Sequence, residues 1–289
     1  MQHNSRIIQS LDCKQLSSVK EMRELISFDL DNGIYMFDIA CKKAEALLGE
    51  TLREYPELRE KMVIQIKCGL HLSEEFGTKF YDLSYEGIIS SVKESLERTN
   101  IKYADVLILE KPDIFLESDQ IARAISELKE KGLVNRFGVA NFPHEAVKYI
   151  SDQTNIPLGI NQLDLNISHL NVVNEVLHTN TERNGSAMTT SELYFYMRRH
   201  GFEIQAVQSS QSLGEYDSKI SEALSRVAKK HNSGLFTILT SFILKLGYNV
   251  NVVIKNCTID EVKECIFSSE SLLTNEEWYY LYQAAGYDL

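Results

Sequence analysis

Apolar runs that alternate with amphipathic stretches along the chain constrain its fold more than any other feature. The runs are short and rich in Val, Ile and Leu, like strands buried on both faces, and they lie at 33–40, 62–68, 103–110, 134–140, 157–163, 203–207 and 250–255. Between them, apolar residues recur at the 3.6-residue period of a helix, as at Ile121, Ala124, Ile125 and Leu128. Repeated strand–helix units form parallel sheets with right-handed crossovers. With a short first strand near 6–10 the units number eight, which predicts one α/β domain over 1–289, a (β/α)8 TIM barrel.

The stretch 33–50, GIYMFDIACKKAEALLGE, contains the first candidate functional residue. Gly33 ends any preceding helix, and the run from Ile34 to Ala40 is apolar except for Asp38. An aspartate at the end of a buried strand is costly unless it is paired or takes part in chemistry. Asp38 is therefore either a structural cap or ion-pair partner, or a member of a site.

Two further charged residues end apolar runs in the same way. Lys67 interrupts VIQIKCG, and Glu110 closes VLILE. Barrel enzymes carry their reacting groups at the C-terminal ends of the strands, and a buried lysine requires a carboxylate partner. The sequence predicts that Asp38, Lys67 and Glu110 meet at the C-terminal mouth, either as catalytic groups or as an ion-pair cluster that closes the barrel.

Composition narrows the class of protein. A net charge of −11 with no stripe of Lys or Arg argues against nucleic acid as a partner. No apolar run long enough for a membrane span and no signal-peptide pattern occurs, so we expect a cytoplasmic protein without membrane association. The five cysteines lack disulfide or zinc-ligand spacing, and we expect no metal. Cys41, Cys68 and Cys257 follow strand ends, where a redox or nucleophilic role is the less favoured alternative to simple burial.

Several segments, in order over nearly the whole chain, carry a family signature. They are FDIA followed by LLGETL, IQIKCG at 64–69, the segment 84–113, ISELKEKGLVNRFGVANF at 125–142, INQLDL at 160–165 and LTNEEWYYLYQAAGYDL at 273–289. Together they resemble the aldo-keto reductases, and most closely the bacterial oxidoreductases of that superfamily. The resemblance implies descent from NAD(P)H-dependent carbonyl oxidoreductases with a barrel fold.

The chain ends in a segment that predicts an extra helix. Thr274 and Glu277 have the spacing of a capping box, and an apolar stripe follows at Trp278, Leu281, Tyr282 and Ala285. We expect these aromatic residues in the core rather than at a cofactor. Two irregular stretches, 71–83 and 166–188, are expected to be long loops over one end of the barrel.

The resemblance also implies a catalytic set of aspartate, tyrosine, lysine and histidine. In that family the tyrosine gives a proton to the carbonyl oxygen while NAD(P)H delivers hydride to the carbon. Asp38 and Lys67 match two members, but only six residues separate Asp38 from Glu45 and none is tyrosine, an interval about four residues shorter than in relatives. Glu110 stands in place of the histidine. Ordinary carbonyl reduction is therefore expected to be weak or absent.

For the cofactor, the resemblance assigns two groups of residues. Asn141 and Gln162 match residues that hold the nicotinamide carboxamide, and Lys255 with Asn256 resembles the pair that grips the adenosine 2′-phosphate. Glu261 takes the place of a phosphate-binding arginine, and its charge would repel that phosphate, so NADH is expected to be favoured over NADPH. For Asn141 and Gln162, a purely structural role at the barrel mouth remains open.

Three interpretations follow. The first is an NAD(P)H-dependent reductase with a rearranged acid, for which Tyr81 or a protonated Glu110 is the candidate. The second is a non-redox lyase or isomerase that uses Asp38, Lys67 and Glu110 for acid–base work on a small molecule. The third is a pseudoenzyme that keeps the barrel as a binding or scaffold surface for a protein partner.

Overall fold

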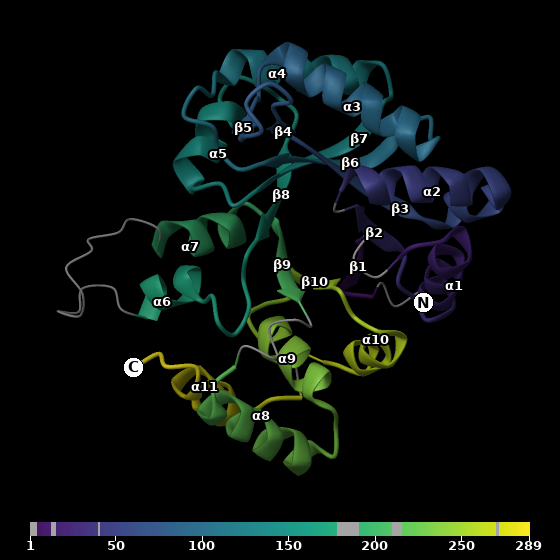
Figure 1. Ribbon diagram of the computed structural model, residues 1–289. Coiled ribbons are helices and arrows are strands. Elements are labelled where there is room, and N and C mark those ends of the chain that lie inside the picture. The colour runs from purple at the N-terminus through teal and green to yellow at the C-terminus, as the bar shows by residue number, and fades with distance from the viewer. Residues whose placement is uncertain (1–4, 13–15, 40, 178–190, 210–215, 270–271) are drawn as a thin grey trace. The chain divides into compact units, whose positions relative to one another are not determined.

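The computed structural model describes residues 5–12, 16–39, 41–177, 191–209, 216–269 and 272–289 (Figure 1). Eight parallel strands of these segments close into one barrel in the order β1-β10-β9-β8-β7-β6-β3-β2. The strands are β1 Ile7–Leu11, β2 Met36–Ile39, β3 Val63–Cys68, β6 Ala104–Glu110, β7 Val134–Ala140, β8 Leu158–Leu163, β9 Glu203–Ser209 and β10 Val250–Lys255. The predicted (β/α)8 fold is confirmed.

Helices follow the strands along the chain. They are α1 Val19–Asp31, α2 Lys42–Glu54, α3 Tyr85–Thr99, α4 Ser118–Glu130, α5 His144–Ser151, α6 Asn171–Leu177, α7 Ser191–Arg199, α8 Ser218–His231, α9 Leu235–Leu244, α10 Ile259–Ile266 and α11 Asn275–Ala284, with a 3₁₀ helix at Pro56–Lys61. Among these helices, none combines the length and apolarity needed to cross a bilayer. Helix α11 is the predicted additional C-terminal helix.

The chain divides into two compact units, and the described residues of the first are 9–12, 16–39 and 41–162. Within it, helices α1 to α5 pack in succession, each against the next, as Figure 1 shows for α2, α3 and α4. Helix α4 illustrates why they form: Ile121, Ala124, Ile125 and Leu128 are fully buried on one face. Beyond its last turn, Gly132 takes a φ of +64°, which an L side chain rarely adopts.

The described residues of the second unit are 5–8, 163–177, 191–209, 216–269 and 272–289. In it α11 packs against α8, α8 against α9, and α9 against α10. The predicted capping box of α11 is present, because Thr274 accepts from the backbone of Glu277 and Glu277 accepts from that of Thr274. Trp278 is buried and its ring stacks on Phe242 with centroids 4.8 Å apart. These aromatic residues belong to the core, as expected, although Ala284 is buried where we predicted Ala285, which caps the helix.

The expectation of long irregular loops needs correction in two places. The stretch 71–83 contains most of an antiparallel hairpin, β4 Leu70–Leu72 with β5 Lys79–Tyr81. In 166–188, residues 171–177 form α6, and 178–188 lie outside the described residues. Both elements are short, so the hydrophobic pattern that marks longer helices and strands is too brief to reveal them.

In the first unit, a small apolar cluster lies on the face of the strands that points into the barrel. Val106, Ile108, Ala140 and Ile160 form it with Met36 and Val63, and all six residues lie on strands. A Cβ at Gly138 would come within 2.6 Å of the Ile160 Cβ and 2.8 Å of the Ile108 side chain, so this strand needs glycine there. Because side chains alternate along a strand, the residues two positions further on face the same interior.

Candidate functional site

Strand alternation brings the predicted charged residues onto the interior face. Asp38 lies two residues after Met36, Glu110 two after Ile108, and Gln162 two after Ile160. Lys67 pairs in register with Ile108, and Glu110 with Ala140, which in turn pairs with Gln162. The register therefore places Glu110 and Gln162 in one layer of the interior.

Three of these side chains and one further residue, Gln65, form a connected group, which we call the Lys67 network: Asp38, Gln65, Lys67 and Gln162. The Lys67 ammonium lies 2.9 Å from Asp38 Oδ2 and donates to Gln162 Oε1 at 2.7 Å. Gln65 Nε2 and Gln162 Nε2 donate to Asp38 Oδ1, at 2.6 and 3.3 Å. The predicted pairing of Lys67 with a carboxylate on a neighbouring strand is thus present.

Hydrogen bonding offsets the cost of burying this ion pair. The Asp38 side chain is 3% exposed and that of Lys67 17%, so both charges are largely removed from water. A buried pair is tolerated when further hydrogen bonds satisfy its remaining lone pairs and protons, which Gln65 and Gln162 do here. An ammonium has three N–H donors, and the contacts to Asp38 and Gln162 use two of Lys67's. The third is taken by no residue in the described part of the chain.

Glu110 ends β6 half-buried, close to the Cys68 thiol on the adjacent strand. Burial raises the pKa of Cys68, and the Glu110 charge raises it further. A buried thiol held protonated is a poor nucleophile, so Cys68 fits the structural alternative rather than a redox role. The contact of Glu110 with Lys67 and its catalytic role remain predictions.

Asn141 and Gln162 meet through the backbone at the ends of β7 and β8. The Asn141 N–H donates to the Gln162 carbonyl at 2.8 Å, and Asn141 has a φ of +56°. Asparagine tolerates this left-handed conformation better than most residues. The Gln162 side chain belongs to the Lys67 network. The sequence had predicted a contact with the nicotinamide for this residue, but not its hydrogen bonds to Lys67 and Asp38.

The predicted phosphate-binding residues lie in the second unit, where β10 runs into α10. Lys255 ends the strand and Asn256 follows with a φ of +57°. The Glu261 carboxylate accepts from the backbone N–H and the hydroxyl of Thr258, at 2.6 and 3.0 Å, and so completes a capping box. The capping box therefore holds the Glu261 carboxylate at the start of α10.

The connection from β2 to α2 is very short. β2 ends at Ile39 and α2 begins at Lys42, so Ala40, which lies outside the described residues, and Cys41 form the whole connection. Neither is a tyrosine. Tyr81, the substitute considered from the sequence, pairs with Leu70 in the β4–β5 hairpin and is half-buried.

Comparison with known proteins identifies the family. The model of the aldo/keto reductase family matches residues 15–285, and the chain belongs to this family. It is 25% identical over 279 residues to the oxidoreductase YdhF of Escherichia coli, covering 92% of this chain and 89% of the relative. It is 24% identical over 250 residues to a 6-dehydroglucose reductase of Agrobacterium fabrum, covering 84% and 78%.

Solved structures support the same fold. A glycerol dehydrogenase from Gluconobacter oxydans superposes with a TM-score of 0.74 over 97% of this chain and 91% of its own, at 19% identity. A thermostable aldo-keto reductase in complex with the inhibitor epalrestat gives 0.72 over 96% and 94%, also at 19% identity. The aldo/keto reductases generally use NAD(P)H, and the chain is an oxidoreductase-like member of their family.

Sequence reasoning missed Gln65. It makes a 2.6 Å hydrogen bond to Asp38, and the two residues are direct neighbours in the register of β2 and β3. The signal was present, because Gln65 lies two residues before Lys67 and therefore on the same face of the strand. A buried glutamine beside a predicted buried charge is a candidate partner.

Proposed function

We propose that this protein is an NAD(P)H-dependent oxidoreductase of altered mechanism, in which Lys67 rather than a tyrosine contacts the substrate carbonyl. The observation that supports it is the Lys67 ammonium, which Asp38 and Gln162 hold in place and whose third N–H no residue of the described segments accepts. The two-residue connection after β2 removes the segment that would carry a tyrosine. Ordinary aldehydes should therefore be reduced slowly.

In this proposal Lys67 stabilises the negative charge that develops on the carbonyl oxygen during reduction. A bound nicotinamide would supply hydride to the carbonyl carbon, and negative charge then develops on the oxygen. An oriented ammonium in a site shielded from water stabilises such charge strongly, since its hydrogen bonds need no reorganisation. Proton transfer is the weaker part, because the Lys67 ammonium already donates two of its N–H groups to Asp38 and Gln162. General-acid catalysis raises the rate of such a reaction by about 10²–10⁴-fold, so without it we expect carbonyl reduction to be slower by about that factor.

Asp38 and Glu110 have different parts in this proposal. Both Asp38 oxygens accept hydrogen bonds in the buried network, so the part of Asp38 is to position Lys67 rather than to remove a proton from the substrate. Glu110 lies in the layer of Gln162 and would orient the substrate where the family places histidine. The non-redox interpretation requires a free base, which Asp38 does not offer in this arrangement.

We further propose that the dinucleotide is NADH in preference to NADPH. The residues at the end of β10 suit the adenosine half of a dinucleotide in one respect. Lys255 and Asn256 carry hydrogen-bond donors and lie just before the N-terminus of α10. The Glu261 carboxylate, fixed in the capping box, opposes a 2′-phosphate through like charge. Asn141 and Gln162 would hold the nicotinamide carboxamide. To do so, the Gln162 amide would give up its hydrogen bond to Lys67 or to Asp38 and form one to the carboxamide instead.

The test combines binding and turnover. Titrating purified protein with NADH and NADPH by nicotinamide fluorescence should give saturable binding, tighter for NADH. With saturating NADH and a reactive aldehyde, wild-type turnover should be slow, and Lys67→Met should abolish it without loss of NADH binding. Lys219→Met, a surface lysine on α8, serves as the control and should leave both unchanged.

Two outcomes would contradict the proposal. Slow turnover that survives Lys67→Met would show that Lys67 does not contact the reacting carbonyl. Absence of binding to both dinucleotides would favour the pseudoenzyme, a barrel retained for binding a partner. The hydrogen bonds between Asp38, Gln65, Lys67 and Gln162 also fit that alternative, because they could simply stabilise the barrel.

A further inference from the structure

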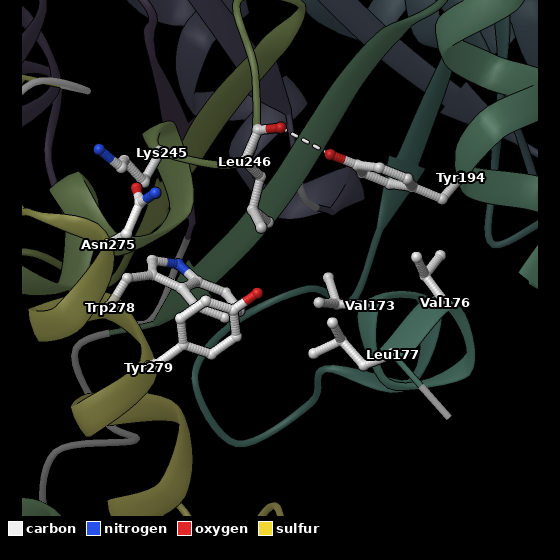
Figure 2. Close-up of a pocket in the computed structure, with 9 residues that line it drawn as sticks. All are labelled: Val173, Val176, Leu177, Tyr194, Lys245, Leu246, Asn275, Trp278 and Tyr279. Carbon is white, nitrogen blue, oxygen red and sulfur yellow. Dashed lines mark hydrogen bonds between the residues drawn. The ribbon is translucent and has the colours of Figure 1, made fainter. Parts of the chain in front are cut away.

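The second unit contains a pocket whose lining residues take no part in the function proposed above. It has a volume of about 260 Å³ and opens between α6, α7, the end of α9 and α11, as Figure 2 shows. Three residues of α6, Val173, Val176 and Leu177, form an aliphatic wall, and Leu246 adds to it. A pocket with such walls favours a ligand with an apolar body.

The opposite wall is aromatic and fixed in place. Trp278 stacks on Phe242, and its indole N–H donates to the Phe242 carbonyl at 3.0 Å. Tyr279 meets Trp278 edge to face, with centroids 5.1 Å apart. In Figure 2 the Tyr279 hydroxyl points from this wall toward the aliphatic side. Offset or edge contacts with these rings would suit an aromatic ligand.

The polar groups at the pocket fall into two sets. Those of Tyr194 and Trp278 already make hydrogen bonds within the protein. The Tyr194 hydroxyl donates to the Leu246 carbonyl at 2.6 Å, and the Trp278 indole N–H donates to the Phe242 carbonyl. The Lys245 ammonium, the Asn275 amide and the Tyr279 hydroxyl make no hydrogen bond or ion pair with the described residues. All three can donate, and one is a cation, so they complement a ligand that accepts hydrogen bonds and carries negative charge.

We propose that this pocket binds an aromatic monocarboxylate, with the ring between α6 and Trp278 and the carboxylate at Lys245 and Asn275. A cavity of about 150 Å³ holds benzene, so the larger volume here leaves room for a short acidic arm. The Lys245 ammonium points outward in Figure 2, and its flexible stem allows it to turn toward the ligand. Asn275 begins α11, and its side-chain amide can donate a hydrogen bond to the same carboxylate.

Trp278 is the single tryptophan of the chain and therefore reports on this pocket directly. The probe is 3-phenylpropionate, with 3-phenylpropan-1-ol as the uncharged match, each titrated while tryptophan fluorescence is recorded. The acid should give a saturable change, with a dissociation constant on the order of 0.1–1 mM for a ligand of this size. The alcohol should bind about tenfold more weakly, because it lacks the charge-assisted contact.

Two variants and a control test the assignment. Lys245→Met keeps the apolar stem and should remove the preference for the acid, and Val176→Phe should fill the cavity and weaken both probes. Lys219→Met, outside the pocket, should behave as wild type. Circular dichroism confirms that each variant is folded. No saturable change with the acid, equal affinity for acid and alcohol, or a preference unchanged in Lys245→Met would overturn the proposal.

Discussion

At the residue scale, Asp29 is a buried carboxyl group in α1 with an unusual environment. It has no exposed surface, and neither carboxyl oxygen hydrogen-bonds with any described residue. Burial raises its pKa to about 8. Because the folded-state pKa exceeds the unfolded one, this group favours the unfolded state increasingly as pH rises. The loss of stability begins near the ordinary aspartate pKa and is complete above about pH 8.

We therefore expect Asp29→Asn to stabilise the protein in a pH-dependent way. The gain in unfolding free energy should be near zero at about pH 4 and reach roughly 4–6 kcal/mol above about pH 8. Urea denaturation across this range is the measurement, with Asp31→Asn, an exposed residue of the same helix, as the control. A constant difference at all pH values would mean that Asp29 does not titrate as described.

At the element scale, Glu277 joins the C-terminal helix α11 to α8. Its Oε1 lies 2.6 Å from the Lys230 ammonium and 2.9 Å from His231 Nε2. Burial acts to raise the pKa of Glu277, but hydrogen bonds from Lys230, the Thr274 backbone and His231 lower it to about 2. The folded-state pKa is depressed, so this contribution is present above the ordinary glutamate pKa and is lost as pH falls toward about 2.

Glu277→Leu should lower the unfolding free energy at neutral pH by about 1–3 kcal/mol, since it removes charge-assisted bonds and half of the capping box. The variant should also lose part of the dependence of stability on pH between about 4.5 and 2. Thermal denaturation at several pH values measures both effects. Glu276→Leu, at an exposed neighbouring position, should change neither by a comparable amount.

Helix α10 provides a separate test of cofactor choice. Glu261→Gln removes the charge but keeps a side chain that can complete the capping box. We expect NADPH binding to improve by about two- to fivefold relative to NADH, the effect of one screened charge. Glu261→Arg should improve it by about ten- to a hundredfold through a new charge-assisted contact, with some loss of helix capping.

Calorimetric titration with both dinucleotides gives these ratios. Asp260→Asn removes the adjacent charge and serves as the control for a general electrostatic effect. If Asp260→Asn changes the NADPH to NADH ratio as much as Glu261→Gln does, Glu261 has no special position toward the 2′-phosphate.

At the scale of the whole molecule, the proposed function attributes slow aldehyde reduction to the short connection between β2 and α2. Inserting four residues there, with a tyrosine five positions after Asp38, should raise NADH-dependent aldehyde reduction by about 10²–10⁴-fold. The same insertion with phenylalanine is the matched control, because it restores the length without the acid. Robust aldehyde reduction by the wild-type protein would show that another residue replaces the tyrosine, and Tyr81 would be the first to mutate.

The barrel, its C-terminal helix and the pairing of Asp38 with Lys67 were all determined by the sequence itself. Strand and helix periods are local properties of a chain, and a buried lysine at a strand end requires a carboxylate nearby. The capping box of Thr274 and Glu277 is equally local, because its two residues lie three apart.

Only the tertiary structure decided which further groups surround these residues. Gln162 reaches Lys67 across 95 residues of sequence, and strand order and register, rather than local pattern, bring them together. The pocket around Trp278 likewise collects side chains from α6, α7, α11 and the two residues that follow α9, and none of these helices by itself differs from an ordinary amphipathic or apolar helix. Hydrogen-bond partners and cavities depend on contacts between distant segments, and no periodicity within one segment encodes them.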